Sequence, residues 1–377
     1  VERYEDIHQT FPEELQSSAL PSFIDWFIGN VILVKITAYS DENAYTIFET
    51  MNDRGMNLTA TEMLKGYVLS RINDTTKRSD VNYYWKEHIF NLHNKNDSAD
   101  VEFFKAWFRA KYAITVRERK ADSENQDYEQ IGTRLHDWFK NNHKEKFNLT
   151  QPDEFYDFFK NELRFFVSAY LDILNKSETF DPDYKYLYYI NRWGIAKSIQ
   201  DALLLAPLKS SDSKEIINNK LNAVARFVET YTVRRSINFR KFGQSSIRYT
   251  FFKTIKDIRN LDLDELKKTL YQKLQDMNEN FNGVLNFKLH QQNKKFVKHL
   301  LSRITAYVDQ NSGRNTSYDL YHEPKGKKFE IEHLLKNNFE AFEDEFDKES
   351  EFISARNSIG ALILLPNGTN QSFNSDD

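Results

Sequence analysis

Apolar residues recur at intervals of three and four along most of this chain, which is the spacing of one face of an α-helix. From about residue 80 to residue 285 this spacing predicts one helix after another, many of them with aromatic faces. Asn293 to Val308 is the clearest case, and its inward face should carry Phe296, Val297, Leu300, Leu301, Ile304 and Tyr307. No fixed-period repeat accompanies the pattern, which argues against a solenoid. The sequence therefore predicts a mainly α fold with a multi-helical body.

The first part of the chain mixes helical and strand-like patterns. Residues 12–28 are expected to form a helix, and Val31 to Ala38, rich in β-branched residues, a buried strand. A further helix should begin at Asp41 and end near Gly55, because glycine readily adopts the left-handed conformation of a helix C-cap.

The pattern changes after residue 310. Gln310 to Lys328 is polar and contains glycine and proline, which is typical of a loop or linker. The elements expected after it are a strand over Lys328 to Leu335, an acidic helix over Phe339 to Phe352, a second strand over Ala361 to Leu365, a turn over Pro366 to Gly368 and a helix opened by Asn370. Strand, excursion, strand, turn and helix is the order of a small C-terminal ββα-metal finger, which would span residues 328–377.

Composition narrows the classes of protein. Hydrophobic residues make up 40% of the chain and charged residues 29%, which is typical of a globular protein. No run approaches the roughly 20 apolar residues of a membrane span, so no membrane partner is expected. The chain has no cysteine, which excludes disulfides and thiol nucleophiles and fits a cytoplasmic location. Any metal ion must therefore be held by oxygen and imidazole ligands.

Positive charge is concentrated locally, although the formal net charge is −4. Residues 231–256 and residues 288–303 contain no Asp or Glu. The cations of these two stripes that we expect to contact DNA phosphates are Arg234, Arg235, Arg240, Lys241, Arg248, Lys294, Lys295 and Lys298. Solvated helix faces are the alternative interpretation of both stripes.

The residues best suited to chemistry are Glu332 and His333, at the end of the first finger strand, with Asn357 and Asn370 after them. A neutral imidazole, whose ordinary pKa is ~6.5, can take a proton from a water that attacks a phosphodiester. A hard divalent cation on carboxylate and amide oxygens can neutralise the phosphate. Neighbouring residues on a strand point to opposite faces, so a twist or bulge must let Glu332 and His333 serve one site. An isolated surface pair is the alternative.

Three segments around these residues carry a family resemblance: Ile331 to Leu335, Arg356 to Pro366, and Asn370 to Ser372. Together they resemble the nuclease domain of GmrSD-type restriction proteins, one of the His-Asn-His, or His-Me finger, nucleases. The resemblance implies His333 as general base and Glu332 and Asn370 as ligands of a divalent metal such as Mg²⁺. Many relatives carry an asparagine that orients the catalytic histidine where this chain has Ala361, so Asn357 takes that role or a structural one.

A second segment runs from Ala44 to Gly55 and on to Lys65. It reads as a helix, a glycine C-cap and a new helix that Thr59 and Thr61 start together with Glu62. It also resembles the segment that closes the companion GmrS-type domain, a ParB/sulfiredoxin-like module implicated in nucleotide hydrolysis and in sensing modified DNA. That resemblance implies contacts of Arg54 and Lys65 with a nucleoside triphosphate, and a domain core that precedes Val1.

The two resemblances imply three domains: residues 1–75 as the end of the GmrS-like domain, 76–285 as a helical middle region and 286–377 as the nuclease domain. The implied function is a metal-dependent endonuclease of a modification-dependent, anti-phage restriction system that cuts double-stranded, modified phage DNA, with a homodimer allowed. Two alternatives stay open. One is a DNA-modification-sensing or nucleotide-dependent binding module with a degenerate finger, and the other is a helical scaffold for partner proteins.

Overall fold

The computed structural model describes residues 58–118, 120, 123–193, 197–241, 243–322 and 328–369, and before them residues 5, 10–12, 15, 18–32, 37 and 47. The chain divides into two compact units, residues 1–57 and 58–377. The domain boundaries expected at residues 75 and 285 stay predictions. Within the described ranges, every helix is too short or too polar to cross a lipid bilayer.

Helix α2, Leu20–Asn30, is the described helix of the first unit. The prediction of a helix over residues 12–28 was wrong at its start, because Pro21 lies in the first turn, where proline is best tolerated. Phe23 packs against Phe11, Trp26 and Phe27 with ring centroids 6.0 to 6.3 Å apart. Of the expected strand from Val31 to Ala38, the structure describes Val31, Ile32 and Thr37, and Val31 and Ile32 are not in a strand. Of the expected helix from Asp41 to Gly55, the structure describes Ile47. The other residues of both segments lie outside the described residues.

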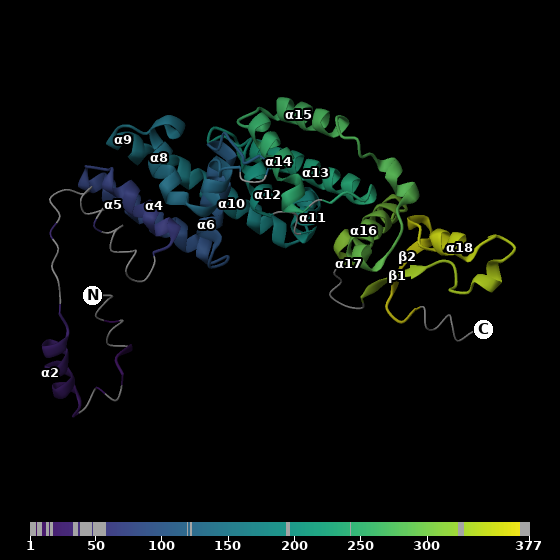
Figure 1. Cartoon of the computed structure of the whole chain (residues 1–377), viewed down its shortest axis with the longest axis horizontal. Coiled ribbons are helices and arrows are strands. Elements are labelled where there is room, and N and C mark those ends of the chain that lie inside the picture. The colour runs from purple at the N-terminus through teal and green to yellow at the C-terminus, as the bar shows by residue number, and fades with distance from the viewer. Residues whose placement is uncertain are drawn as a thin grey trace. The chain divides into compact units, whose positions relative to one another are not determined.

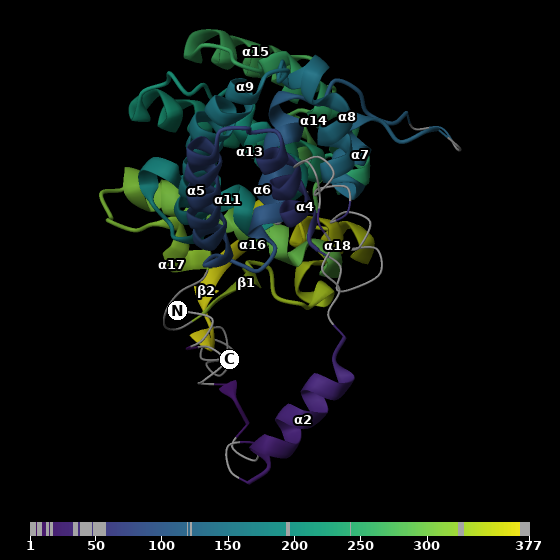
Figure 2. The same ribbon diagram turned by 90° about the vertical axis from the view of Figure 1, so that its left-hand side faces the viewer.

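The second unit is mainly helical, as predicted (Figure 1). Its first helices are α4 (Ala60–Ser70), α5 (Thr75–His93), α6 (Ala99–Lys111), α7 (Asp127–Thr133), α8 (Leu135–Phe147), α9 (Pro152–Asp157) and α10 (Leu163–Glu178), with the π-helical turn η2 (Phe158–Glu162) joining α9 to α10. The next are α11 (Lys185–Trp193), α12 (Lys197–Leu205), α13 (Lys214–Ile237), α14 (Gln244–Ile258) and α15 (Leu263–Gln275), with the short 3-10 helix η3 (Pro182–Tyr184) before α11. Within this unit, α4 and α5 lie in front of α11 and α13 in Figure 2.

The predicted start of α4 is confirmed, with Thr59 as its N-cap and Glu62 completing a capping box. The Glu62 side chain accepts from the Thr59 backbone N–H at 2.8 Å, and the Thr59 hydroxyl accepts from the Glu62 backbone N–H at 3.2 Å. These two bonds satisfy donors that the first turn of a helix leaves free, so the sequence alone fixes where α4 begins.

Aromatic side chains form the core of this helical body, which we define as α4 to α15. Trp107 of α6 is fully buried, and its ring stacks on Phe158 at 5.4 Å, on Phe166 at 5.3 Å and on Phe103 at 5.6 Å between centroids. Stacked and edge-to-face rings bury large apolar areas and add specific attraction. The high aromatic content of the sequence is therefore used mainly for packing in this region.

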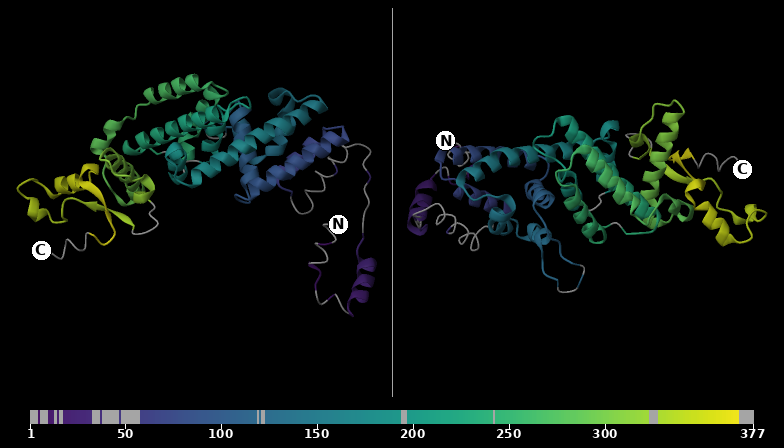
Figure 3. Two further views of the ribbon diagram at one scale, coloured as in Figure 1. Left: turned by 180° about the vertical axis from the view of Figure 1, so that it is seen from behind. Right: turned by 90° about the horizontal axis from the view of Figure 1, so that it is seen from above.

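The C-terminal region, residues 281–369, contains the predicted strand pair (Figure 3). Its elements are η4 (Phe281–Asn286), η5 (Gln291–Asn293), α16 (Lys294–Asn311), α17 (Tyr318–His322), β1 (Phe329–His333), η6 (Phe339–Phe342), α18 (Glu349–Arg356), η7 (Ile359–Ala361) and β2 (Leu362–Pro366). Strands β1 and β2 are antiparallel, with Ile331 opposite Leu364 and His333 opposite Leu362. Gly368, with φ +81°, makes the predicted turn after β2.

The strand pair completes its core with residues from the helical body. One cluster of buried side chains joins Val233 and Ile237 of α13 to Val297 of α16, Ile331 of β1 and Leu364 of β2. A two-stranded sheet alone has too little apolar surface to be stable in water. The strands therefore depend on α13 and α16, and this core crosses the expected domain boundary at residue 285.

Three expectations for this region were wrong. The stretch from Gln310 to Lys328 is not only a linker, because it forms α17, whose Tyr318, Tyr321 and His322 are buried. The acidic helix expected over Phe339 to Phe352 is instead two short helices, η6 and α18. The like charges between them disfavour a continuous helix, and three phenylalanines gather on Phe352: Phe339, Phe342 and Phe346.

The third expectation concerned α16, which forms as predicted but buries a narrower face. Ile304 and Tyr307 were expected to lie inward, yet they are 49% and 68% exposed. The buried face of α16 is occupied by α17 and β2, so these two side chains border a cavity instead.

Candidate active site

The last residue of β1 is His333, and the chain turns away directly after it. The backbone N–H of Leu334 donates to the carbonyl of Ala361, the residue before β2, at 2.9 Å, and the pairing of the two strands ends there. His333 is partly buried at this edge, and its Nε2 lies 3.1 Å from Oδ1 of Asn357. The two residues are 24 positions apart in the chain, so the contact depends on how α18 packs against the strands.

Asn357 is held on three sides at the end of α18. Its side-chain Nδ2 donates to the carbonyl of Ile353 at 2.9 Å, and its backbone N–H donates to the same carbonyl at 3.1 Å. Its own carbonyl accepts from the N–H of Leu289 at 2.8 Å. With Nδ2 already donating, the atom that faces His333 is the oxygen, which can only accept.

This arrangement selects one tautomer of His333. Because Asn357 Oδ1 accepts, Nε2 of His333 carries the hydrogen, and Nδ1 of the neutral ring keeps its lone pair. A fixed tautomer with one nitrogen anchored and the other unprotonated is what a general base requires. Asn357 therefore lies in a position from which it can orient the ring of His333, and its role in catalysis stays a prediction.

The surroundings keep His333 neutral. Partial burial, followed by the nearby cation of Arg356, lowers the pKa of His333 below its ordinary value of 6.5, while the hydrogen bond to Asn357 and the charge of Glu332 oppose that shift. The net direction is downward, so the imidazole is unprotonated at neutral pH. It can therefore accept a proton there.

Arg356 is a site residue that sequence reasoning missed. Its Nε donates to the carbonyl of Leu335, two residues after β1, at 3.0 Å. Its charge lowers the pKa of His333, and burial lowers its own pKa against the opposing charge of Glu332. The only signal in the sequence was its position directly before Asn357.

The metal site expected on Glu332 and Asn370 is placed only in part. Glu332 is half-buried, opposite Ile363 in the strand pair, and Asn370 lies outside the described residues. Among the residues that the structure describes, no three His, Asp or Glu side chains lie close enough together to hold a metal ion. Because Asn370 lies outside those residues, the expected pair of metal ligands stays a prediction.

The first basic stripe meets acids from other elements. Glu279 lies 3.3 Å from Arg235 and 3.8 Å from Arg240, and Glu129 of α7 lies 3.4 Å from Arg248. These two acids come from distant parts of the chain and offset part of the positive charge that the sequence suggested. Lys241 is exposed, and its carbonyl accepts from Arg235 at 2.9 Å.

The remaining predicted contact residues are spread over the molecule. Lys294 and Lys295 are exposed on the first turn of α16, and Lys298 is half-buried one turn later. Lys65 is half-buried on α4, where burial and the charge of Lys86 lower its pKa. Arg54 lies outside the described residues. The DNA and nucleotide contacts assigned to these residues stay predictions.

Comparison of the chain with protein-family models, with curated proteins and with solved structures found no match.

Proposed function

We propose that this chain is a nuclease in which His333 is the general base for hydrolysis of a phosphodiester. The observation that carries the proposal is the contact between His333 Nε2 and Asn357 Oδ1, which leaves Nδ1 of a neutral ring unprotonated. Further support comes from the resemblance of the surrounding segments to His-Me finger nucleases.

In this proposal Nδ1 of His333 takes a proton from a water molecule as the water oxygen bonds to phosphorus and the bond to the leaving oxygen breaks. The imidazolium that forms keeps its Nε2 hydrogen bond to Asn357. Arg356, beside His333, offers a cation to the phosphate oxygens, which is a common role of a guanidinium. A divalent cation such as Mg²⁺, bound through Glu332 and Asn370, would neutralise the phosphate further.

The substrate and the biological role come from the resemblance. We propose double-stranded DNA as the substrate, modified phage DNA as the target and a modification-dependent restriction system as the setting. A nucleoside triphosphate belongs to the GmrS-like part of the proposal, with Arg54 and Lys65 as its contacts.

Replacing His333 by alanine tests the proposal. The full chain would be incubated with modified and with unmodified plasmid DNA, with and without Mg²⁺ and nucleotide. We expect His333→Ala to reduce the rate of cutting by about 100- to 10,000-fold, since a positioned acid or base contributes that much. His93→Ala, on α5 in the helical body, is the matched control and should cut at the wild-type rate.

Unchanged cutting by His333→Ala, with an unchanged melting temperature, would falsify the assignment. If the wild-type chain binds DNA but does not cut it under any of these conditions, a binding module with a degenerate finger becomes the better description.

A further inference from the structure

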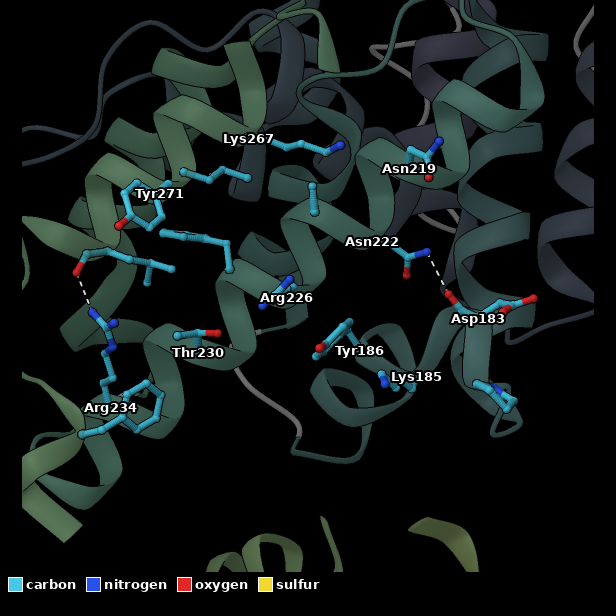
Figure 4. A pocket seen from close by; sticks show the side chains of 16 residues that line it. Asp183, Lys185, Tyr186, Asn219, Asn222, Arg226, Thr230, Arg234, Lys267 and Tyr271 are labelled. Carbon is cyan, nitrogen blue, oxygen red and sulfur yellow. Dashed lines mark hydrogen bonds between the residues drawn. The ribbon is translucent and has the colours of Figure 1, made fainter. Parts of the chain in front are cut away.

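A cavity of about 870 Å³ opens between η3, α11, α13 and α15 of the helical body (Figure 4). Its size is within the usual range for sites that bind small organic ligands. We propose that this cavity, the α13 cavity, binds a nucleotide unit: a phosphate together with a stacked base, presented either by a free nucleotide or by an unpaired nucleotide of a nucleic-acid strand.

The charge of the lining favours an anion. Its cations are Lys185, Arg226, Arg234 and Lys267, and Asp183 is the one carboxylate among the described lining residues. Within the described part of the chain, no carboxylate pairs with Lys185, Arg226 or Lys267. Cations that converge on a concave surface without acid partners attract phosphate groups.

Aromatic rings alternate with these cations. The ammonium of Lys185 lies 5.6 Å from the centre of the Tyr186 ring, and the guanidinium of Arg226 lies 5.9 Å from it. Tyr271 is 64% exposed and Phe281 is 51% exposed at the border of the cavity. Rings beside cations provide stacking for a base and charge for its phosphate, which is the usual composition of single-strand nucleic-acid sites.

Two polar atoms of the lining have no hydrogen-bond partner among the residues that the structure describes. Asn222 lines the cavity and donates from Nδ2 to the carbonyl of Asp183 at 2.8 Å, but its Oδ1 is buried without a hydrogen-bond donor. Nε of Arg234 is likewise buried without an acceptor, although its Nη1 donates to Leu274 at 2.5 Å. Buried polar atoms without partners cost stability, so a rotation of either side chain that brings its atom to a bound ligand would be favourable.

A second cavity, of about 530 Å³, continues the first toward the strand pair. It shares Tyr186, Arg226, Thr230 and Phe281 with the α13 cavity. Its far wall includes Ile304 of α16 and Ile359, two residues after Asn357. A nucleic-acid strand with one nucleotide in the α13 cavity could therefore extend toward His333. That extension rests on the proposed nuclease function, whereas nucleotide binding in the cavity does not.

The test is a binding measurement with the full chain carrying His333→Ala, so that bound DNA is not cut. The probe is a fluorescent 12-mer of thymidylate, followed by anisotropy as a function of salt. We expect Lys267→Ala to weaken binding about fivefold and to lower the slope of log K against log salt by about one, as for the loss of one phosphate contact. Lys268→Ala removes the neighbouring lysine of α15, which is not in the lining, and should change neither quantity.

A second pair of variants tests stacking. Tyr271→Ala should weaken binding of the 12-mer about tenfold, because loss of one base–aromatic contact has an effect of this size. Tyr83→Ala removes a tyrosine of α5 with similar exposure, 66%, and should have no effect.

Competition identifies the source of the nucleotide. If thymidine monophosphate displaces the 12-mer, the cavity accepts a free nucleotide. If neither thymidine monophosphate nor a 12-base-pair duplex displaces the 12-mer, the cavity accepts an unpaired strand. Either result, with the two variant pairs behaving as stated, supports the proposal. Equal effects of Lys267→Ala and Lys268→Ala, or equal displacement by hexaglutamate, would overturn it. Residual cutting by His333→Ala would contradict the nuclease proposal and leave the binding result standing.

Discussion

The helical body and the C-terminal strand pair each contain a side chain with a lowered pKa, Lys111 and His333, but the two differ in their hydrogen bonding. In the body, burial lowers the pKa of Lys111 to about 7, yet its ammonium donates to the carbonyls of Ala206 and Leu208 and to Asn260. All three of its hydrogens are used to join helix ends, so a displaced pKa here is structural. His333 has one nitrogen anchored by Asn357 and the other left for chemistry. A shifted pKa therefore indicates function only where a reactive atom remains available.

The largest expected effect concerns the body. Trp107→Ala removes a fully buried ring at the centre of the aromatic core and should lower the free energy of unfolding by about 3–5 kcal/mol. Urea unfolding measures it, with the exposed Tyr83→Ala as control. Because the strand pair shares a core with α13, we expect one cooperative transition. A separate transition for the strand pair, or a loss below about 1 kcal/mol, would contradict this description.

The next effect concerns the site itself. Asn357→Ala should lower the cutting rate about 100-fold while the fold persists, because His333 would lose the contact that fixes its tautomer. Kinetics on plasmid DNA measure the cutting rate, and a thermal melt shows whether the fold persists. Asn286→Ala, an exposed asparagine of η4, is the control. Wild-type cutting by Asn357→Ala would show that Asn357 is only structural.

A third prediction contrasts a buried acid with an exposed one. Burial raises the pKa of Asp201 from 3.8 to about 6, and this group is fully buried in the body. The folded protein thus holds the proton more tightly than the unfolded chain, so the contribution of Asp201 to stability falls as pH rises from about 4 to about 6 and stays low above it.

Asp201→Asn removes that penalty and should stabilise the protein by about 3 kcal/mol at pH 8, with little change near pH 4. Urea unfolding at both pH values checks this. Asp344→Asn, an exposed carboxyl between η6 and α18, should change stability by less than about 0.5 kcal/mol at either pH. Destabilisation by Asp201→Asn at pH 8 would mean that its contacts with Lys197 and Tyr170 outweigh burial.

The smallest expected effect is on the pH dependence of the cutting rate. A general base acts when it is neutral, and the lowered pKa of His333 should keep cutting active at a lower pH than an ordinary imidazole allows. Arg356→Gln removes the cation that helps to lower this pKa, so the acid limb of the rate profile should move to higher pH. Arg314→Gln, an exposed arginine after α16, should leave the limb in place. If the acid limb does not move in Arg356→Gln, then Arg356 does not lower the pKa of His333.

The sequence by itself determined the local elements of this protein. Apolar spacing predicted α16 and the helical body, the Thr59 to Glu62 segment predicted the start of α4, and short strand-like segments predicted β1 and β2. These features depend on neighbours a few residues apart, and such interactions are the same wherever the segment lies in the fold.

Only the tertiary structure decided which residues meet. It brought Glu279 and Glu129 to the basic stripe, left Ile304 and Tyr307 at a cavity, and set Asn357 against His333 across 24 positions of chain. Each of these contacts depends on the path of the chain between distant helices. Local spacing carries no information about that path, because many arrangements of the same helices bury equally apolar faces.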